Sequence, residues 1–340
     1  MTALSLGQTF NTIVGLIAGM VMARVLSQTE LATYRQTLLA YQVAMPLLSL
    51  GITHGIYYFL PTEKKRGRGI VVDALVMMLV MGSLYALFIA LGGNHVLAKR
   101  FSNPAIVNTL VYLVPLPLVM LPAGLLASVM VVQQQIKRLT IYNILTNLVL
   151  GAGIIGACLY WKKPEAMVIA QVAIGVAIGM IGIRLMLRVA PRDDWRPSWQ
   201  GMKTLLFFSM PLVTASALGS IFQQLDKIIV SSMCDPASFA VYSNRAIEIP
   251  LVGIITGSIA AVIQPDLRRM VAGGDKRAAL ALFSQAADKS ALILIPVMMF
   301  LMVSAEPFIL TLFSSKYAGS VLPFRLYLLI LPIRIAQYGS

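Results

Sequence analysis

The sequence predicts an all-α membrane protein, a polytopic bundle of transmembrane helices. Its 340 residues are 58% hydrophobic and 12% charged, about half the charged share of roughly 25% in soluble domains. The mean hydropathy is +0.82, and the apolar residues form long continuous runs. A soluble fold cannot hide so much apolar surface, whereas lipid solvates every face of a helix. Continuous runs also exclude a transmembrane barrel, whose strands alternate apolar and polar residues.

Ten apolar runs are long enough to cross the hydrocarbon, which takes on the order of twenty helical residues. The first run lacks a basic leading region and is followed by equally apolar runs, so it predicts a first span and not a signal peptide. Proline and charged residues separate the runs, for example at 61–66 and 161–164. In chain order the predicted spans are 3–23, 37–59, 70–91, 106–132, 140–160, 166–187, 205–224, 242–264, 290–312 and 321–338.

Basic residues are distributed unevenly between alternate loops. The loops after even-numbered spans hold fifteen Lys and Arg residues, and those after odd-numbered spans hold seven. Under the positive-inside rule the even loops and the N-terminus face the cytoplasm. The same pattern explains the net charge of +14 without nucleic acid, since no basic face is free of membrane spans.

The chain carries few residues for redox, metal or nucleotide chemistry. Its two cysteines, Cys158 and Cys234, are too scattered for a disulfide framework or a metal site. The only histidines are His54 and His95, which leaves little scope for a His-based metal cage or a His-dependent triad. No segment fits a P-loop for ATP. We therefore expect no enzyme, no metal and no cofactor.

A weak internal repeat predicts how the spans are grouped. Four features recur about 210 residues further on, as the pairs Tyr34/Tyr242, Pro61/Pro265, Phe101/Phe313 and Tyr112/Tyr327. A unit of six spans keeps both copies in one orientation, so two lobes would be related by a pseudo-twofold axis along the membrane normal. We expect an N-terminal lobe (1–190), a cytoplasmic linker (191–204) and a C-terminal lobe (205–340). The second lobe would lack its last two helices.

Several short segments carry a family resemblance: ARVLS at 23–27, ELATY at 30–34, QLDKIIV at 224–230, AVY at 240–242 and LFSSKY at 312–317. They resemble the polysaccharide or oligosaccharide flippases of the multidrug/oligosaccharidyl-lipid/polysaccharide exporter superfamily. The similarity covers essentially the whole chain. It departs from the family at Ala32 and Ala240, where the family commonly has glycine before tyrosine.

The resemblance implies a transporter of the bacterial cytoplasmic membrane. Such flippases move undecaprenyl-pyrophosphate-linked oligosaccharide repeat units between leaflets for O-antigen, lipopolysaccharide or other cell-surface polysaccharide synthesis. They work by alternating access to a central cavity. The expected partners are the lipid-linked substrate, membrane lipids, and possible polymerase and chain-length machinery. Nucleic acid is not expected.

Ionisable residues inside spans are costly and usually face a cavity, which makes them candidates for substrate binding. Four arginines fit this description, since the guanidinium group matches phosphate oxygens. The alternative for those near span ends is snorkelling to the headgroups. Glu248 lies three residues after one of them, on the same helical face, and would form either a structural pair or a proton- or cation-linked switch. The candidates are Arg35, Arg245, Arg325, Arg334 and Glu248.

Three further charged residues are candidates for gating or coupling. Asp226 and Lys227 are expected at the outer end of span 7, as a gate between lobes or an interfacial helix-end pair. Asp73, near the inner end of span 3, would relay protons or complement a helix N-terminus.

Three other function classes remain open. A multidrug or cation antiporter of the same superfamily would need intramembrane carboxylates, whereas arginines prevail within these spans. A membrane glycosyltransferase or polymerase would need large extramembrane loops or catalytic carboxylates. An inactive or assembly-partner fragment would follow from missing terminal helices.

Overall fold

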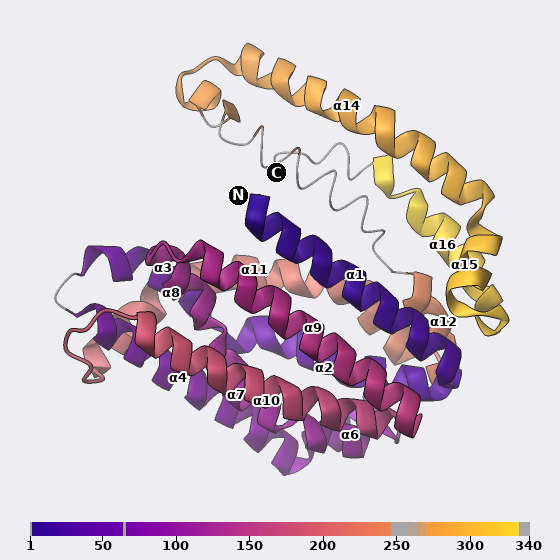
Figure 1. The fold of residues 1–340 in the computed structure, drawn as a ribbon, viewed down its shortest axis with the longest axis horizontal. Helices are drawn as coiled ribbons and strands as arrows, with labels where there is room; N and C mark the ends of the chain where they lie inside the picture. Colours follow the sequence, from indigo (N-terminus) through magenta and orange to yellow (C-terminus); the bar gives the residue numbers. More distant parts are fainter. Residues whose placement is uncertain are drawn as a thin grey trace. The chain divides into compact units, whose positions relative to one another are not determined.

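The computed structural model describes residues 2–63, 66–245 and 269–332, together with Ile259, Ile263, Asp266 and Leu267. Within these residues the regular secondary structure is entirely helical (Figure 1). Six described helical segments are long and apolar enough to cross a membrane, and a bent pair of helices at 199–233 makes a seventh. The chain is therefore a multi-pass helical membrane protein.

The chain divides into two compact units, Val25–Ala240 and Met1–Arg24 with Val241–Ser340. The larger unit holds all helices from α2 to α11. The lobes expected from the internal repeat, with a boundary at 191–204, stay a prediction.

Close helix packing builds the larger unit. Helix α7 packs against both α4 and α10, α9 packs on α10, and α11 packs along α2 and α3 (Figure 1). Glycines permit this approach: a Cβ added at Gly82 of α4 would lie 2.9 Å from the Cα of Leu118 in α7. Small residues at helix contacts are the usual device for close packing in membranes. The helices are α2 (Gln28–Leu48), α3 (Ile52–Thr62), α4 (Gly67–Phe88), α5 (Asn94–Arg100), α6 (Ile106–Leu113), α7 (Pro115–Ala123), α8 (Leu125–Val132), α9 (Ile136–Trp161), α10 (Pro164–Val189) and α11 (Trp199–Met233).

Predicted spans 2 to 7 all fall on helices, although several are broken. The third continues through a π-helical turn, Ile89–Gly93, into α5. The fourth is divided into α6, α7 and α8. The first of these breaks falls at Pro115, because proline has no N–H for the helical ladder and its ring crowds the preceding turn.

Several predicted helix boundaries were wrong. Helix α2 begins nine residues before predicted span 2. Helix α11 continues to Met233, so Asp226 and Lys227 lie inside a helix and not at its end. Helix α14 (Lys276–Val303) begins fourteen residues before predicted span 9, because the Asp275 side chain accepts the Ala278 N–H and caps it. The basic residues of its first turn therefore lie on a helix and not in a loop, and the orientation from the loop charges stays a prediction. The same predicted span is interrupted at Ser304, where α14 ends and α15 (Ala305–Phe313) begins.

The smaller unit contains most of α1 (Thr2–Val25), the end of α12 (Pro236–Arg245), α14, α15 and α16 (Val321–Leu328). Helices α14, α15 and α16 pack on one another (Figure 1). Their core is aromatic: Phe313, Tyr317 and Phe324 are at most 2% exposed, and Phe308 stacks on Phe324 at 5.5 Å between ring centroids. Most of predicted span 8 and the end of span 10 lie outside the described residues.

Candidate functional site

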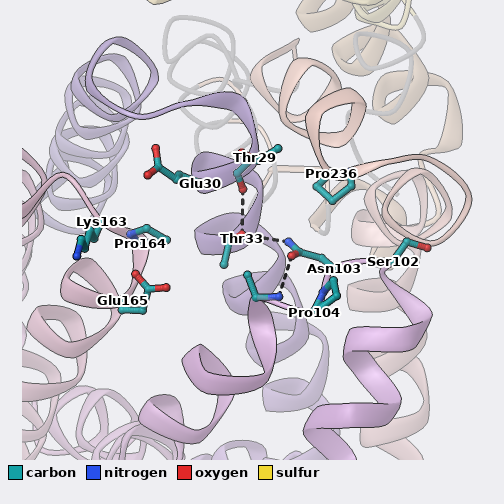
Figure 2. A pocket seen from close by; sticks show the side chains of 11 residues that line it. Thr29, Glu30, Thr33, Ser102, Asn103, Pro104, Lys163, Pro164, Glu165 and Pro236 are labelled. Carbon is teal, nitrogen blue, oxygen red and sulfur yellow. Dashed lines mark hydrogen bonds between the residues drawn. The ribbon is translucent and has the colours of Figure 1, made fainter.

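A hollow that several polar side chains line lies at one end of the larger unit. Its volume is about 640 Å³, and its side chains come from four separate segments of the chain (Figure 2). We call this hollow the vestibule. Its lining residues are Thr29, Glu30, Thr33, Ser102, Asn103, Pro104, Ala105, Lys163, Pro164, Glu165 and Pro236.

The four segments follow predicted spans 1, 3, 5 and 7. The structure therefore brings the odd-numbered connections together at one end of this unit, as the alternation of spans requires. That this end faces outward stays a prediction from the loop charges.

Two carboxylates and one ammonium group give the vestibule its charge. Glu30 is half-buried and belongs to a capping box, in which its Oε2 accepts the Ser27 N–H at 2.8 Å and the Ser27 hydroxyl at 2.7 Å. Glu165 lies in the first turn of α10, beside the exposed Lys163 (Figure 2). The lining is therefore net negative and rich in hydrogen-bonding groups.

Asn103 anchors the floor of the vestibule. Its side chain is 5% exposed. Its Nδ2 donates to Thr33 Oγ1 at 3.1 Å, and its Oδ1 accepts the Ala105 N–H at 3.1 Å (Figure 2). The same Nδ2 donates to Gln36 Oε1 at 2.6 Å. Thr33 in turn donates to the Thr29 carbonyl at 2.9 Å. A buried amide with all these partners fixes the loop after α5 against α2.

Gln36 extends this network into the protein. It is fully buried, and its Nε2 donates to the Phe101 carbonyl at 3.2 Å and to Ser231 Oγ of α11 at 3.0 Å. Side chains from α2, α11 and the loop after α5 are thereby held together under the vestibule.

Asp235 lies next to the vestibule, just before α12. The Ser238 backbone N–H and hydroxyl donate to its carboxylate at 2.8 and 2.7 Å. These hydrogen bonds lower the pKa of Asp235 below its ordinary value, so this carboxylate is ionised at neutral pH.

A second polar cluster lies near the start of α4, where Asp73 is fully buried. Its Oδ2 pairs with Arg66 Nη2 at 2.9 Å, and its Oδ1 accepts the Ser198 N–H at 2.7 Å. Ser198 is the N-cap of α11, so Asp73 complements the N-terminus of another helix. This contact is the one expected of a helix-end role for Asp73, and both that role and the proton relay stay predictions.

The other predicted site residues occupy different places. Arg35 is half-buried on α2, and Arg325 donates through Nε to the Met302 carbonyl at 3.2 Å. On α11, Lys227 donates to Gln224 Oε1 at 3.1 Å, beside the half-buried Asp226. Arg245 is the last residue of α12, and its side chain is outside the description, as are Glu248 and Arg334 entirely. The substrate and gating roles of these residues stay predictions.

The vestibule carboxylates Glu30 and Glu165 and the amide of Asn103 were not among the predicted site residues. The sequence places them at helix starts and in short connections, where acidic and amide residues ordinarily serve as caps. These residues come together only through helix packing, so no local sequence motif predicts that they are close in space.

Fold and composition together define a multi-pass helical membrane protein. The sequence profile of the polysaccharide biosynthesis protein family matches residues 21–322, and the chain belongs to that family.

One curated relative is the probable lipid II flippase MurJ of Rhizobium meliloti (strain 1021). The two chains are 26% identical over 160 residues, which is 47% of this chain and 29% of the relative. The match thus spans less than a third of that relative's length.

Solved structures share the fold over nearly the whole chain. A lipid II flippase MurJ in an inward closed conformation has a TM-score of 0.75 at 13% identity, covering 98% of this chain and 74% of that one. An outward-facing multidrug resistance MATE transporter of the MOP superfamily has a TM-score of 0.64 at 13% identity, covering 98% and 78%. The chain therefore has the fold of MOP-superfamily transporters, as its segments resembling that superfamily predicted.

Proposed function

We propose that this protein is a flippase that carries lipid-linked oligosaccharide across the bacterial cytoplasmic membrane. The observation that carries the proposal is membership of the polysaccharide biosynthesis family, joined to a fold shared with a lipid II flippase. An undecaprenyl-pyrophosphate carrier and a repeat unit for surface polysaccharide or O-antigen are the finer expectations. A polymerase and chain-length proteins would then act on the product.

Such a substrate presents two different problems to the protein. Its polyprenyl tail can stay in lipid, whereas its pyrophosphate and sugars must cross hydrocarbon that excludes polar groups. Intramembrane guanidinium groups would neutralise the pyrophosphate, which is the role we propose for Arg35, Arg245, Arg325 and Arg334. Glu248 would pair with Arg245.

The membrane potential could supply the energy. Each charge moved across 100 mV is worth about 2.3 kcal/mol, and outward movement of an anionic headgroup from a negative interior runs downhill. Full transport after collapse of the potential, with the pH gradient clamped, would exclude this energy source.

The residues that line the vestibule are of the types that bind saccharides, which favours a saccharide as the polar part of the cargo. Hydroxyl, amide and carboxylate groups offer hydrogen bonds to sugar hydroxyls, and Pro104, Pro164 and Pro236 add small apolar surfaces. We propose that sugars pass through the vestibule on their way to or from the membrane surface.

A leaflet assay tests the proposed function. Everted vesicles containing the full chain would receive fluorescent polyprenyl-pyrophosphate oligosaccharide, and the fraction reaching the protected leaflet would be followed over time. We expect transport that is lost with Arg245→Ala and retained with Arg188→Ala, a basic residue in the last turn of α10. Membrane insertion would be checked for both variants.

The same vesicles distinguish the main alternative. Efflux of a cationic drug against a proton or sodium gradient, with no movement of any lipid-linked saccharide, would assign the protein to the multidrug antiporters. MATE transporters share its fold, so both substrates should be measured side by side.

A further inference from the structure

A second hollow lies on the flank of the larger unit, away from the vestibule residues. It has a volume of about 500 Å³ and lies where α4 and α5 face α6 and α7. We call it the lateral recess. It is lined by Ala86, Ile89, Ala90, Gly92, Asn94, His95, Val111, Val114 and Pro115.

Three sequence features create the lateral recess. At Gly82 the backbones of α4 and α7 are in close contact. After Gly82, the π-helical turn Ile89–Gly93 forms a kink between α4 and α5. Gly92 in this turn has a φ of 96°, a backbone conformation that favours glycine. Opposite this turn, the helix breaks before Pro115. Helices α4 and α7 are therefore in contact at Gly82, and the recess lies between the segments 86–95 and 111–115.

The lateral recess has an apolar wall and a polar end. Alanine, isoleucine, valine and proline form the wall, while Asn94 and His95 mark its end. Asn94 is buried, with its Nδ2 3.4 Å from the Val107 carbonyl and its Oδ1 accepting the His95 N–H at 3.0 Å. The exposed His95 and Lys99 lie four residues apart, on one face of α5.

This polarity matches a lipid lying along a membrane span. The segment Gly67–Arg100 qualifies as one span, and the wall residues Ala86, Ile89 and Ala90 lie within it. Lys99 follows His95 by about one turn of α5, roughly 6 Å along the axis at a rise of about 1.5 Å per residue. Lys99 and Arg100 end this segment, where a span passes from hydrocarbon into headgroups. Basic residues at that depth attract anionic lipids.

We propose that the lateral recess binds a hydrocarbon chain of an anionic membrane phospholipid, with the phosphate beside His95 and Lys99. This site goes beyond the proposed transport function, since it holds a resident lipid and not the cargo. It does not involve the vestibule or the candidate arginines.

Photo-crosslinking in nanodiscs tests the site. The full chain would be placed in phosphatidylglycerol/phosphatidylcholine discs in which one lipid species carries a photoactivatable group on its acyl chain, and labelled peptides would be mapped. We expect labelling of 86–95 and 111–115, stronger with phosphatidylglycerol. Ala90→Trp fills the recess and should reduce this labelling about fivefold, a free-energy change near 1 kcal/mol. Leu91→Trp, at a 79% exposed neighbour, should leave it unchanged.

Further variants keep the proposal testable if Ala90→Trp misfolds. Val114→Trp blocks the recess from the other side and should act alike. His95→Ala with Lys99→Ala should abolish the preference for phosphatidylglycerol while acyl labelling persists. Labelling of Ala90→Trp and Val114→Trp at the level of the unsubstituted chain, with both variants correctly folded, would overturn the site. Displacement of the label by polyprenyl phosphate, but not by excess phosphatidylglycerol, would assign the recess to the cargo's tail and overturn the phospholipid proposal.

Discussion

Ser198 donates its backbone N–H to the buried carboxylate of Asp73 at 2.7 Å, although 125 residues separate them in the chain. The start of α11 is thereby fixed to the first turns of α4. Arg66 completes the cluster through its ion pair with Asp73 and a hydrogen bond of 3.3 Å to the Arg196 carbonyl. The polar segment 191–204, which the sequence predicts to be a linker, is therefore hydrogen-bonded to the start of α4 through Arg196 and Ser198.

We expect Asp73→Ala to lower the free energy of unfolding by about 2–4 kcal/mol, since it leaves Arg66 and the Ser198 N–H without their carboxylate. The measurement is thermal unfolding of the purified chain in a fixed detergent. Glu63→Ala, at an exposed carboxylate just before α4, serves as control and should change little. Gly201→Ala should be as harmful as Asp73→Ala, because its Cβ would overlap Asp73 and Arg66. A melting temperature for Asp73→Ala equal to that of the control would contradict the prediction.

A second prediction concerns the network under the vestibule. Removing the Asn103 amide leaves Thr33 and the buried Gln36 with unmet hydrogen bonds, so Asn103→Ala should cost about 1–3 kcal/mol. Because Asn103 and Gln36 contact each other at 2.6 Å, the two changes should be non-additive by about 0.5–3 kcal/mol in a double-mutant cycle. Strict additivity between Asn103→Ala and Gln36→Ala would show that the two side chains are not energetically coupled.

The sequence predicted where the helices lie better than it predicted which residues contact each other. Apolar runs located spans 2 to 7 because membrane helices need about twenty apolar residues wherever they lie. The start of α14 was missed because its first turns are polar, and the Asp275 cap was the local signal that marked it. Loop alternation correctly grouped the segments that meet in the vestibule.

The partners of individual polar residues could not be predicted in the same way. Asp73 was expected near a helix terminus, but the terminus it serves belongs to α11. Gln36 and Asn103 lie 67 residues apart and meet only once α2 and the loop after α5 are packed. Such pairings depend on helix rotation and tilt, which packing sets and a hydropathy pattern does not encode.

A third prediction compares two helical glycines, one packed against a neighbouring helix and one with open space around it. Gly82→Ala would place a methyl group 2.9 Å from the Leu118 Cα, and the rigid backbone can yield only by separating α4 from α7. We expect a loss of about 1–3 kcal/mol. Gly156 of α9 has nothing within 4 Å of its added Cβ, so Gly156→Ala should be neutral or stabilising by up to about 1 kcal/mol. Unfolding in the same detergent would compare them, and equal effects would refute the proposed close packing.

The last prediction concerns the charge of the vestibule in transport. Glu165→Lys replaces a lining carboxylate with an ammonium beside Lys163, which changes the hydrogen-bonding capacity and sign of the vestibule without disturbing the Glu30 capping box. If sugars pass here, the leaflet assay should show a KM raised about three- to tenfold, which corresponds to about 0.7–1.4 kcal/mol of lost binding, with insertion and melting temperature unchanged. Glu63→Lys, which makes the same charge change outside the vestibule lining, is the matched control. A KM that rises equally in both variants would point to a general effect of surface charge on substrate encounter, whereas unchanged kinetics in Glu165→Lys would remove the vestibule from the transport path.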